Sequence, residues 1–243
     1  RFYLANLYVS GQGVPKDHAE AVRLFTLAAE QDHVLSQLNL AAAYEEGTGV
    51  GRDYEEPLRL YKLAAEQASP LTETELGRAF LRGADARKSD PEKAQLHFDR
   101  ALSMNPTYIP ALFSRGLAKQ QLGEIEAALT DFNSILAVDP KSMVGLMAQG
   151  NLKVRMGDIE GAIADFTEVI QLYPNQGAAF RQRGWALEKL GYVERAIADF
   201  SKVIEIGPKS ADAFVTRAKL KVKKGALESA FQDLDEAIAL SPD

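Results

Sequence analysis

Five prolines recur in the C-terminal part of the 243-residue chain, and each lies 34 residues after the one before it. They are Pro106, Pro140, Pro174, Pro208 and Pro242. The same spacing separates four pairs of an aspartate followed by an aromatic residue or leucine: Asp131-Phe132, Asp165-Phe166, Asp199-Phe200 and Asp233-Leu234. A fixed period of about 20–50 residues is typical of stacked supersecondary units. We therefore expect an array of short repeats that build their core between neighbouring units.

A second period, of 36 residues, governs the N-terminal part. The pattern Tyr-x-x-Gly-x-Gly-Val begins at Tyr8 and again at Tyr44. The segment 76–102 keeps both spacings, and no Pro/Gly/Ser-rich linker separates the two kinds of unit. We expect one continuous array with these parts: 36-residue units at 1–72, the first of them truncated, a hybrid unit at 73–108, and four 34-residue units at 109–243.

Each unit has the pattern of two helices. Between Pro106 and Pro140, apolar residues recur at helical spacing on both sides of Gly123, which predicts a helix, a stop and a second helix. Glycine takes the place of Gly123 in the three later units. In the N-terminal part, Asp17 and Asp53 are expected to cap second helices, each with a glutamate three residues later in capping-box spacing.

On these motifs the chain resembles two related families. The 34-residue units are similar to tetratricopeptide repeats over 109–242, and the 36-residue units are similar to Sel1-like repeats over 1–68. The resemblance implies an all-α fold, a right-handed superhelical α-solenoid of antiparallel helix pairs, in which the first helix of each pair lines a concave groove. It also implies a non-catalytic scaffold that holds peptides or partner proteins.

The two ends of the sequence depart from this pattern. The first expected helix, Arg1 to Ser10, is shorter than its partner, and no polar capping helix follows the last unit. Because the ends of a solenoid need polar caps, we expect the sequence to be a fragment of a longer protein.

Composition and motifs argue against catalysis. The chain has no cysteine and only three histidines, so no thiolate site, disulfide or histidine-rich metal centre is expected. Motif searches find no Walker loop, no zinc-protease signature and no nucleophile elbow. No apolar run approaches the ~18 residues of a membrane span. We therefore predict a non-enzyme without cofactor or metal, with the cytoplasm slightly favoured over the periplasm.

Three arginines are expected to hold the repeats together. Arg115, Arg183 and Arg217 each precede the repeated aspartate by 16 residues, whereas Gln149 occupies this place in the remaining unit. Recurrence in successive units indicates an internal contact between first and second helix. The repeated phenylalanines and the small residues of the first helices are likewise expected to be core, since periodic apolar positions usually face a core.

Charge divides unequally between the two helices of each unit. The four expected first helices with their closing turns, 109–123, 143–157, 177–191 and 211–225, contain twelve basic and two acidic residues. The stretches between and after them contain four basic and sixteen acidic residues. The net charge of −6 conceals this difference. If the first helices line a groove, that groove is basic and the outer surface acidic.

Helical spacing selects the residues expected to point into this groove and bind peptide. They are Phe113, Leu117, Met147, Asn151, Arg155, Arg181, Trp185, Lys189, Lys219 and Lys223. Trp185, the sole tryptophan, stands among cations, which suits an extended peptide with acidic side chains or a free carboxylate. Two alternatives stay open: Lys221, Lys223 and Lys224 could serve the helix dipole only, and Trp185 could belong to the core.

Three classes of function remain open at this stage. The favoured one is an adaptor, monomeric, that binds a protein or peptide partner in the groove. The second is a structural subunit of a larger complex that packs through its ends and convex face. The third, nucleic-acid binding by the basic groove, is the weakest, because the net charge is negative and a single groove aromatic offers little stacking.

Overall fold

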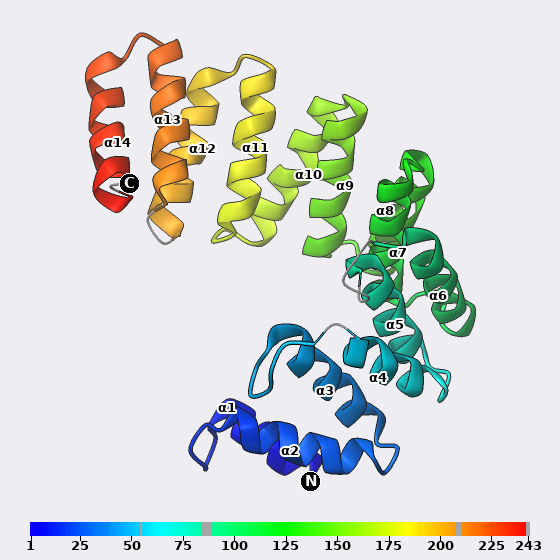
Figure 1. Ribbon diagram of the computed structural model, residues 1–243. Helices are drawn as coiled ribbons and strands as arrows, with labels where there is room; N and C mark the ends of the chain where they lie inside the picture. Colours follow the sequence, from blue (N-terminus) through cyan, green and yellow to red (C-terminus); the bar gives the residue numbers. More distant parts are fainter. Residues whose placement is uncertain (54, 84–88, 208–209, 242–243) are drawn as a thin grey trace. The chain divides into compact units, whose positions relative to one another are not determined.

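The computed structural model describes residues 1–53, 55–83, 89–207 and 210–241, so Pro208 and Pro242 lie outside the described residues. Within these ranges the chain is helical and contains no strand (Figure 1). The helices are α1 (Phe2–Ser10), α2 (His18–Ala29), α3 (Val34–Glu46), α4 (Glu55–Ala65), α5 (Pro70–Arg82), α6 (Pro91–Met104), α7 (Ile109–Leu122), α8 (Ile125–Val138), α9 (Met143–Met156), α10 (Ile159–Leu172), α11 (Gly177–Lys189), α12 (Val193–Ile206), α13 (Ala211–Lys223) and α14 (Leu227–Leu240).

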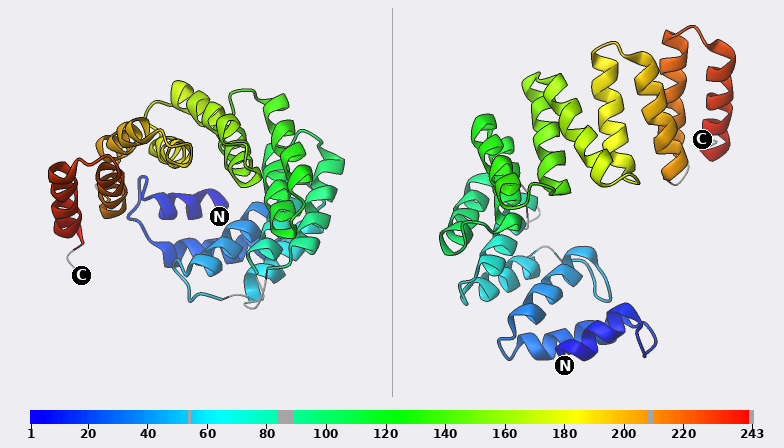
Figure 2. Two further views of the ribbon diagram at one scale, coloured as in Figure 1. Left: turned by 90° about the horizontal axis from the view of Figure 1, so that it is seen from above. Right: turned by 180° about the vertical axis from the view of Figure 1, so that it is seen from behind.

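The chain divides into two compact units, residues 1–134 and 135–243, with the boundary inside α8. Unit 1 contains the helix pairs α1–α2, α3–α4 and α5–α6, followed by α7. Unit 2 contains the pairs α9–α10, α11–α12 and α13–α14, which stand side by side in the right-hand view of Figure 2. Each helix of these pairs packs against its neighbours in the chain. The predicted all-α solenoid of antiparallel helix pairs is confirmed within each unit.

A phenylalanine on the second helix of four pairs fills the space between the two helices. These rings are at most 1% exposed: Phe98, Phe132, Phe166 and Phe200. Each ring lies against a glycine of the first helix, where a Cβ atom would come closer than 3.0 Å to ring carbon: Gly77, Gly116, Gly150 and Gly184. In the last pair Ala218 replaces the glycine and Leu234 replaces the ring. The small residue and the bulky one therefore change together, as close packing of the core requires.

The predicted ends of the helices are confirmed. The four glycines that close the first helices of the 34-residue units, at 123, 157, 191 and 225, have φ values of 80°, 87°, 81° and 82°. This left-handed conformation favours glycine. Asp17 caps α2 by accepting a hydrogen bond from the Glu20 amide at 3.0 Å, and Asp53 accepts from the Glu56 amide at 3.0 Å. The Glu20 carboxylate bonds to Arg23 instead of returning to the backbone, so that part of the capping-box prediction is wrong.

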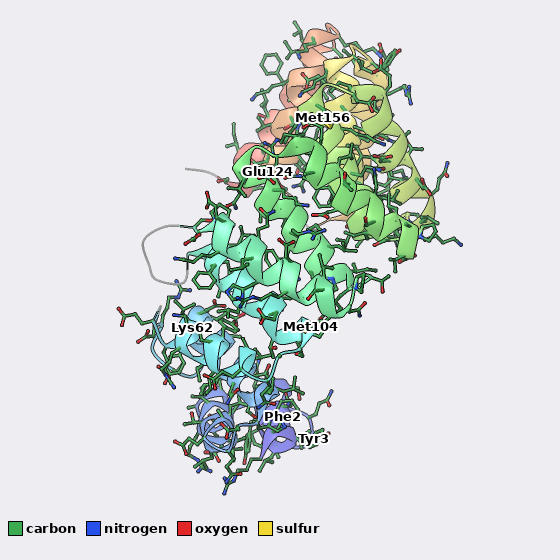
Figure 3. All side chains as sticks on the ribbon, turned by 90° about the vertical axis from the view of Figure 1, so that its right-hand side faces the viewer. Phe2, Tyr3, Lys62, Met104, Glu124 and Met156 are labelled. Carbon is green, nitrogen blue, oxygen red and sulfur yellow. The ribbon has the colours of Figure 1, made fainter. Side chains whose placement is uncertain are left out.

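The short first helix is held to its partner by an aromatic contact. The Phe2 ring lies 6.1 Å from the ring of Phe25 on α2 and 5.5 Å from the neighbouring Tyr3 ring. Phe2 and Tyr3 lie side by side at the start of α1 (Figure 3). Tyr3 points away from the core and is exposed. One aromatic side chain thus replaces the longer contact that a full first helix makes.

Candidate functional site

The predicted contacts between arginine and aspartate are confirmed in three helix pairs. Arg115, Arg183 and Arg217 each donate two hydrogen bonds, through Nε and Nη2, to the carboxylate 16 residues later, at 2.6–3.0 Å. The three acceptors, Asp131, Asp199 and Asp233, are buried. Because bidentate pairing occupies both carboxylate oxygens, these arginines serve the fold.

Each of these arginines also reaches back to the preceding helix pair, which the sequence analysis missed. The third bond runs from Nη1 to a residue 16 positions earlier: Arg115 to Asp99 at 2.7 Å, Arg183 to Thr167 at 3.1 Å and Arg217 to Ser201 at 3.0 Å. One side chain therefore ties three helices together. The available signal was an acceptor side chain at the same distance on both sides of each arginine.

The pair α9–α10 solves the same problem with a weaker partner. Where the other pairs have arginine, Gln149 stands, and the Asp165 carboxylate accepts a bond from Lys153 at 2.8 Å. Burial raises the pKa of Asp165, and Lys153 opposes this effect without overcoming it. At Asp233 burial also raises the pKa, but Arg217 and Lys221 together outweigh it and hold the pKa below its ordinary value.

Several lysines of the first helices are engaged inside the fold. Lys119 lies 2.9 Å from Asp131, and Lys221 lies 2.8 Å from Asp233. Lys224 pairs with Glu194 on α12 at 3.2 Å. Lys223, expected to point freely into the groove, instead forms an ion pair with Glu188 of α11. The basic excess of the first helices is therefore smaller than the sequence indicates.

Three cations of unit 2 remain available on its first helices. Arg181, Lys189 and Lys219 are exposed and make no ion pair or hydrogen bond with any part of the chain that the structure describes. Arg181 and Lys189 lie one turn before and one turn after Trp185 on the same side of α11, since residues four apart are neighbours on a helix. We call Arg181, Trp185 and Lys189 the α11 stripe.

Trp185 combines a packed edge with an open surface. Its ring lies 6.2 Å from the buried Phe200 ring, yet the residue is 42% exposed. Exposed residues occupy the equivalent positions of the adjoining first helices, Asn151 on α9 and Lys219 on α13. Because α9 and α11 contact each other directly, the first helices of these pairs lie side by side. The stripe therefore lies on a surface that α9, α11 and α13 share.

The apolar residues expected in the groove are less open than predicted. Met147 packs against the core cluster that contains Leu146 and Val169. Phe113 and Leu117, in unit 1, are half-buried, and the Phe113 ring lies 6.2 Å from Phe132. These side chains contribute to packing, whereas the exposed predicted residues are the polar ones.

The histidines have structural surroundings, as expected. His33 caps α3 by accepting a bond from the Ser36 amide, and His97 lies 2.7 Å from Glu73 and stacks on Phe80. In the described ranges, no group of three His, Asp or Glu side chains is placed to hold a metal ion. Nor does any described helix have the length and apolar character needed to cross a membrane.

Family comparisons match most of the chain to helical repeats. Residues 1–33, 34–69 and 71–106 match the Sel1 repeat, and residues 110–142 and 147–211 match the tetratricopeptide repeat. The third Sel1 match falls on the segment expected to be a hybrid unit. The division into units stays a prediction. None of the curated proteins matches the sequence.

Solved structures with the same fold are distant in sequence. A tetratricopeptide repeat protein from Parabacteroides merdae is 22% identical, covers 99% of this chain and 91% of its own, and has a TM-score of 0.66. The protective antigen c5321 of uropathogenic Escherichia coli is 22% identical over 99% of this chain and 53% of its own, with a TM-score of 0.65. YrrB, described as a TPR protein with an unusual peptide-binding site, is 22% identical over 75% of this chain and 93% of its own, with a TM-score of 0.58.

Proposed function

Because the chain is a helical-repeat protein with Sel1 repeats followed by tetratricopeptide repeats, we propose that it is a non-catalytic adaptor that binds an extended, acidic segment of a partner protein. The binding surface is the α11 stripe with Lys219 and Asn151 beside it. Phe113, Leu117, Met147 and Lys223 contribute less than the sequence indicated, because their side chains are engaged in packing or in an ion pair.

The observation that carries the proposal is the selective availability of cations around Trp185. Most basic side chains of the first helices are engaged within the fold, but the cations on either side of the tryptophan are not. An internal role does not account for exposed cations that contact no acidic group. Tryptophan and arginine are the residues most enriched in the energetic centres of protein interfaces, and cations that flank an aromatic surface favour carboxylates.

The similarity to YrrB supports this proposal by analogy. That protein is described as carrying a peptide-binding site on a tetratricopeptide scaffold. At 22% identity the similarity concerns the fold, so the chemistry of the peptide is argued here from the side chains of this chain alone.

A charge-reversal variant tests the proposal. The double variant Arg181→Glu, Lys189→Glu should lose binding to an array of immobilised acidic peptides with free carboxylates, while its melting temperature stays close to that of the wild type. The matched control is Arg195→Glu, Lys202→Glu, which makes the same change of charge on α12, where both side chains are also exposed. Equal binding by both double variants would reject the α11 stripe as the site.

A further inference from the structure

The last helix exposes a row of large apolar side chains. Leu227, Phe231 and Ile238 of α14 are 54%, 65% and 61% exposed. Their spacing of four and seven places them on one side of the helix. We call this row the α14 stripe. Scattered apolar residues on a surface need no explanation, but a row along one helix face marks an interaction site.

Earlier helix pairs show what covers this face. Counting back 34 residues, the α14 stripe corresponds to Val193, Ile197 and Ile204 on α12. Val193 and Ile197 pack against the cluster that contains Leu220 of α13, and Ile204 packs against the cluster that contains Ala213 of α13. On α12, therefore, this face carries the first helix of the next pair.

The preceding pair repeats the arrangement. Ile163 and Ile170 of α10 hold the same positions, and they pack against clusters that contain Leu187 and Ala179 of α11. A second helix of this chain thus receives a first helix on this face twice in unit 2. The face of α14 has the same apolar pattern.

Two carboxylates complete the pattern on α14. Asp235 corresponds to Ser201, which accepts the third bond of Arg217, and by the same count to Asp99, which accepts that of Arg115. Glu228 corresponds to Glu194, which pairs with Lys224 near the end of α13. Asp235 and Glu228 are exposed, and neither contacts a cation within the described ranges.

We propose that the α14 stripe, with Asp235 and Glu228, docks a basic amphipathic helix supplied by a partner protein. The helix lies antiparallel to α14 and resembles α13. Apolar residues of its first turn cover Ile238, an arginine in its middle meets Asp235, a leucine one turn later covers Phe231, and a lysine near its end meets Glu228.

Charge argues for this occupant against other helices. The stretch 226–241 contains four acidic residues and no basic one, whereas the first helices of the 34-residue units are basic. A second copy of this chain would offer α1 as its outermost first helix, and residues 2–10 carry no charged side chain. Such a helix would leave Asp235 and Glu228 without partners, so the complementary occupant is a basic helix.

A synthetic peptide provides the direct test. The probe is residues 210–224, acetylated, amidated and labelled with a fluorophore, and its binding to the intact chain is followed by fluorescence anisotropy. We expect saturable one-to-one binding. The variants Phe231→Glu and Asp235→Lys should each weaken it by about tenfold, because both residues lie at the centre of the contact. Both side chains are exposed, so the chain should keep its helix content.

Two controls separate this contact from general charge attraction. Gln232→Lys adds a charge on another side of α14, where the equivalent Ala198 stays exposed beside docked α13, and should leave the affinity unchanged within about twofold. A peptide with Arg217→Glu should bind the wild type weakly and recover affinity on the Asp235→Lys variant. The Lys189→Glu variant should bind the probe normally, which separates this surface from the α11 stripe.

The opposite results are equally definite. Absence of binding by the wild type at about 1 mM peptide, the weakest affinity in the useful range, would overturn the proposal. Unchanged affinity in both the Phe231→Glu and Asp235→Lys variants would do the same. Sedimentation that shows a dimer of the wild type, dissociated by Phe231→Glu, would assign the face to a second copy and contradict a partner helix.

Discussion

The helix pairs α9–α10 and α13–α14 place the same aspartate in the same buried position and hold it in different ways. Asp233 receives two bonds from Arg217 and an ion pair from Lys221, whereas Asp165 is held by Lys153, with Gln149 in the arginine position. The pKa of Asp233 is lowered and that of Asp165 is raised. The comparison teaches that the repeat period specifies where a carboxylate lies, but the number of neighbouring cations decides whether it stabilises the fold.

The largest difference is expected on removing a lysine from each pair. Lys153→Ala leaves Asp165 buried without its cation and should cost about 2 kcal/mol, because an uncompensated buried charge is expensive. Lys221→Ala leaves Arg217 in place and should cost about 1 kcal/mol or less. Urea unfolding followed by circular dichroism measures both values. Equal losses would mean that the second cation on Asp233 contributes as much as the sole cation on Asp165.

The next effect is a gain of stability from restoring the missing arginine. Gln149→Arg should bring a guanidinium to Asp165 as in the other pairs and raise the free energy of unfolding by about 1 kcal/mol. Gln171→Arg on the exposed side of α10 adds the same charge elsewhere and serves as the control. If both variants are equally stable, the gain comes from net charge and not from the buried carboxylate.

The smallest effect is a difference in pH dependence. Asp233, whose folded pKa is lowered, stabilises the fold above its unfolded pKa of about 3.9, and this contribution is lost as the pH falls through the folded value. Asp165, whose folded pKa is raised, carries a cost when ionised, and this cost disappears as the pH falls through its folded value.

Melting temperatures of single variants between about pH 3 and pH 7, the range around the carboxylate pKa, test this difference. Asp233→Asn should lower the melting temperature at pH 7 and have less effect in acid. Asp165→Asn should change it little at pH 7. A larger loss at pH 7 for Asp165→Asn than for Asp233→Asn would reverse the assignment.

Much of the fold follows from the period of the sequence. The spacing of 34 residues predicts the helix pairs, the glycine stops, the buried phenylalanines and the arginine–aspartate contacts, because each depends on residues within one unit. The contact between Lys223 and Glu188 joins neighbouring first helices, and no repeated motif marks it. The partial burial of Met147 depends likewise on how closely α9 and α11 approach. Sequence spacing gives the face of a helix, but not the distance to the next one.

The candidate site shows the same limit in its charges. Counting charges predicts a basic first-helix surface, and the structure assigns most of those cations to internal pairs. What remains around Trp185 is a smaller and more specific set. Only coordinates distinguish a lysine that reaches a carboxylate on the next helix from one that reaches solvent.

The most direct test of the account uses the fluorescence of Trp185, which reports on the α11 stripe alone because it is the sole tryptophan. A peptide of alternating glutamate and leucine with a free carboxylate is titrated into the intact chain at about 0.02 M salt and at about 0.5 M salt, where exposed charges are strongly screened. The account predicts a saturable shift of the emission at low salt that weakens at high salt, and no shift with a lysine–leucine control peptide. Binding of the acidic peptide without any change in Trp185 emission, or the same response to the basic peptide, would contradict it.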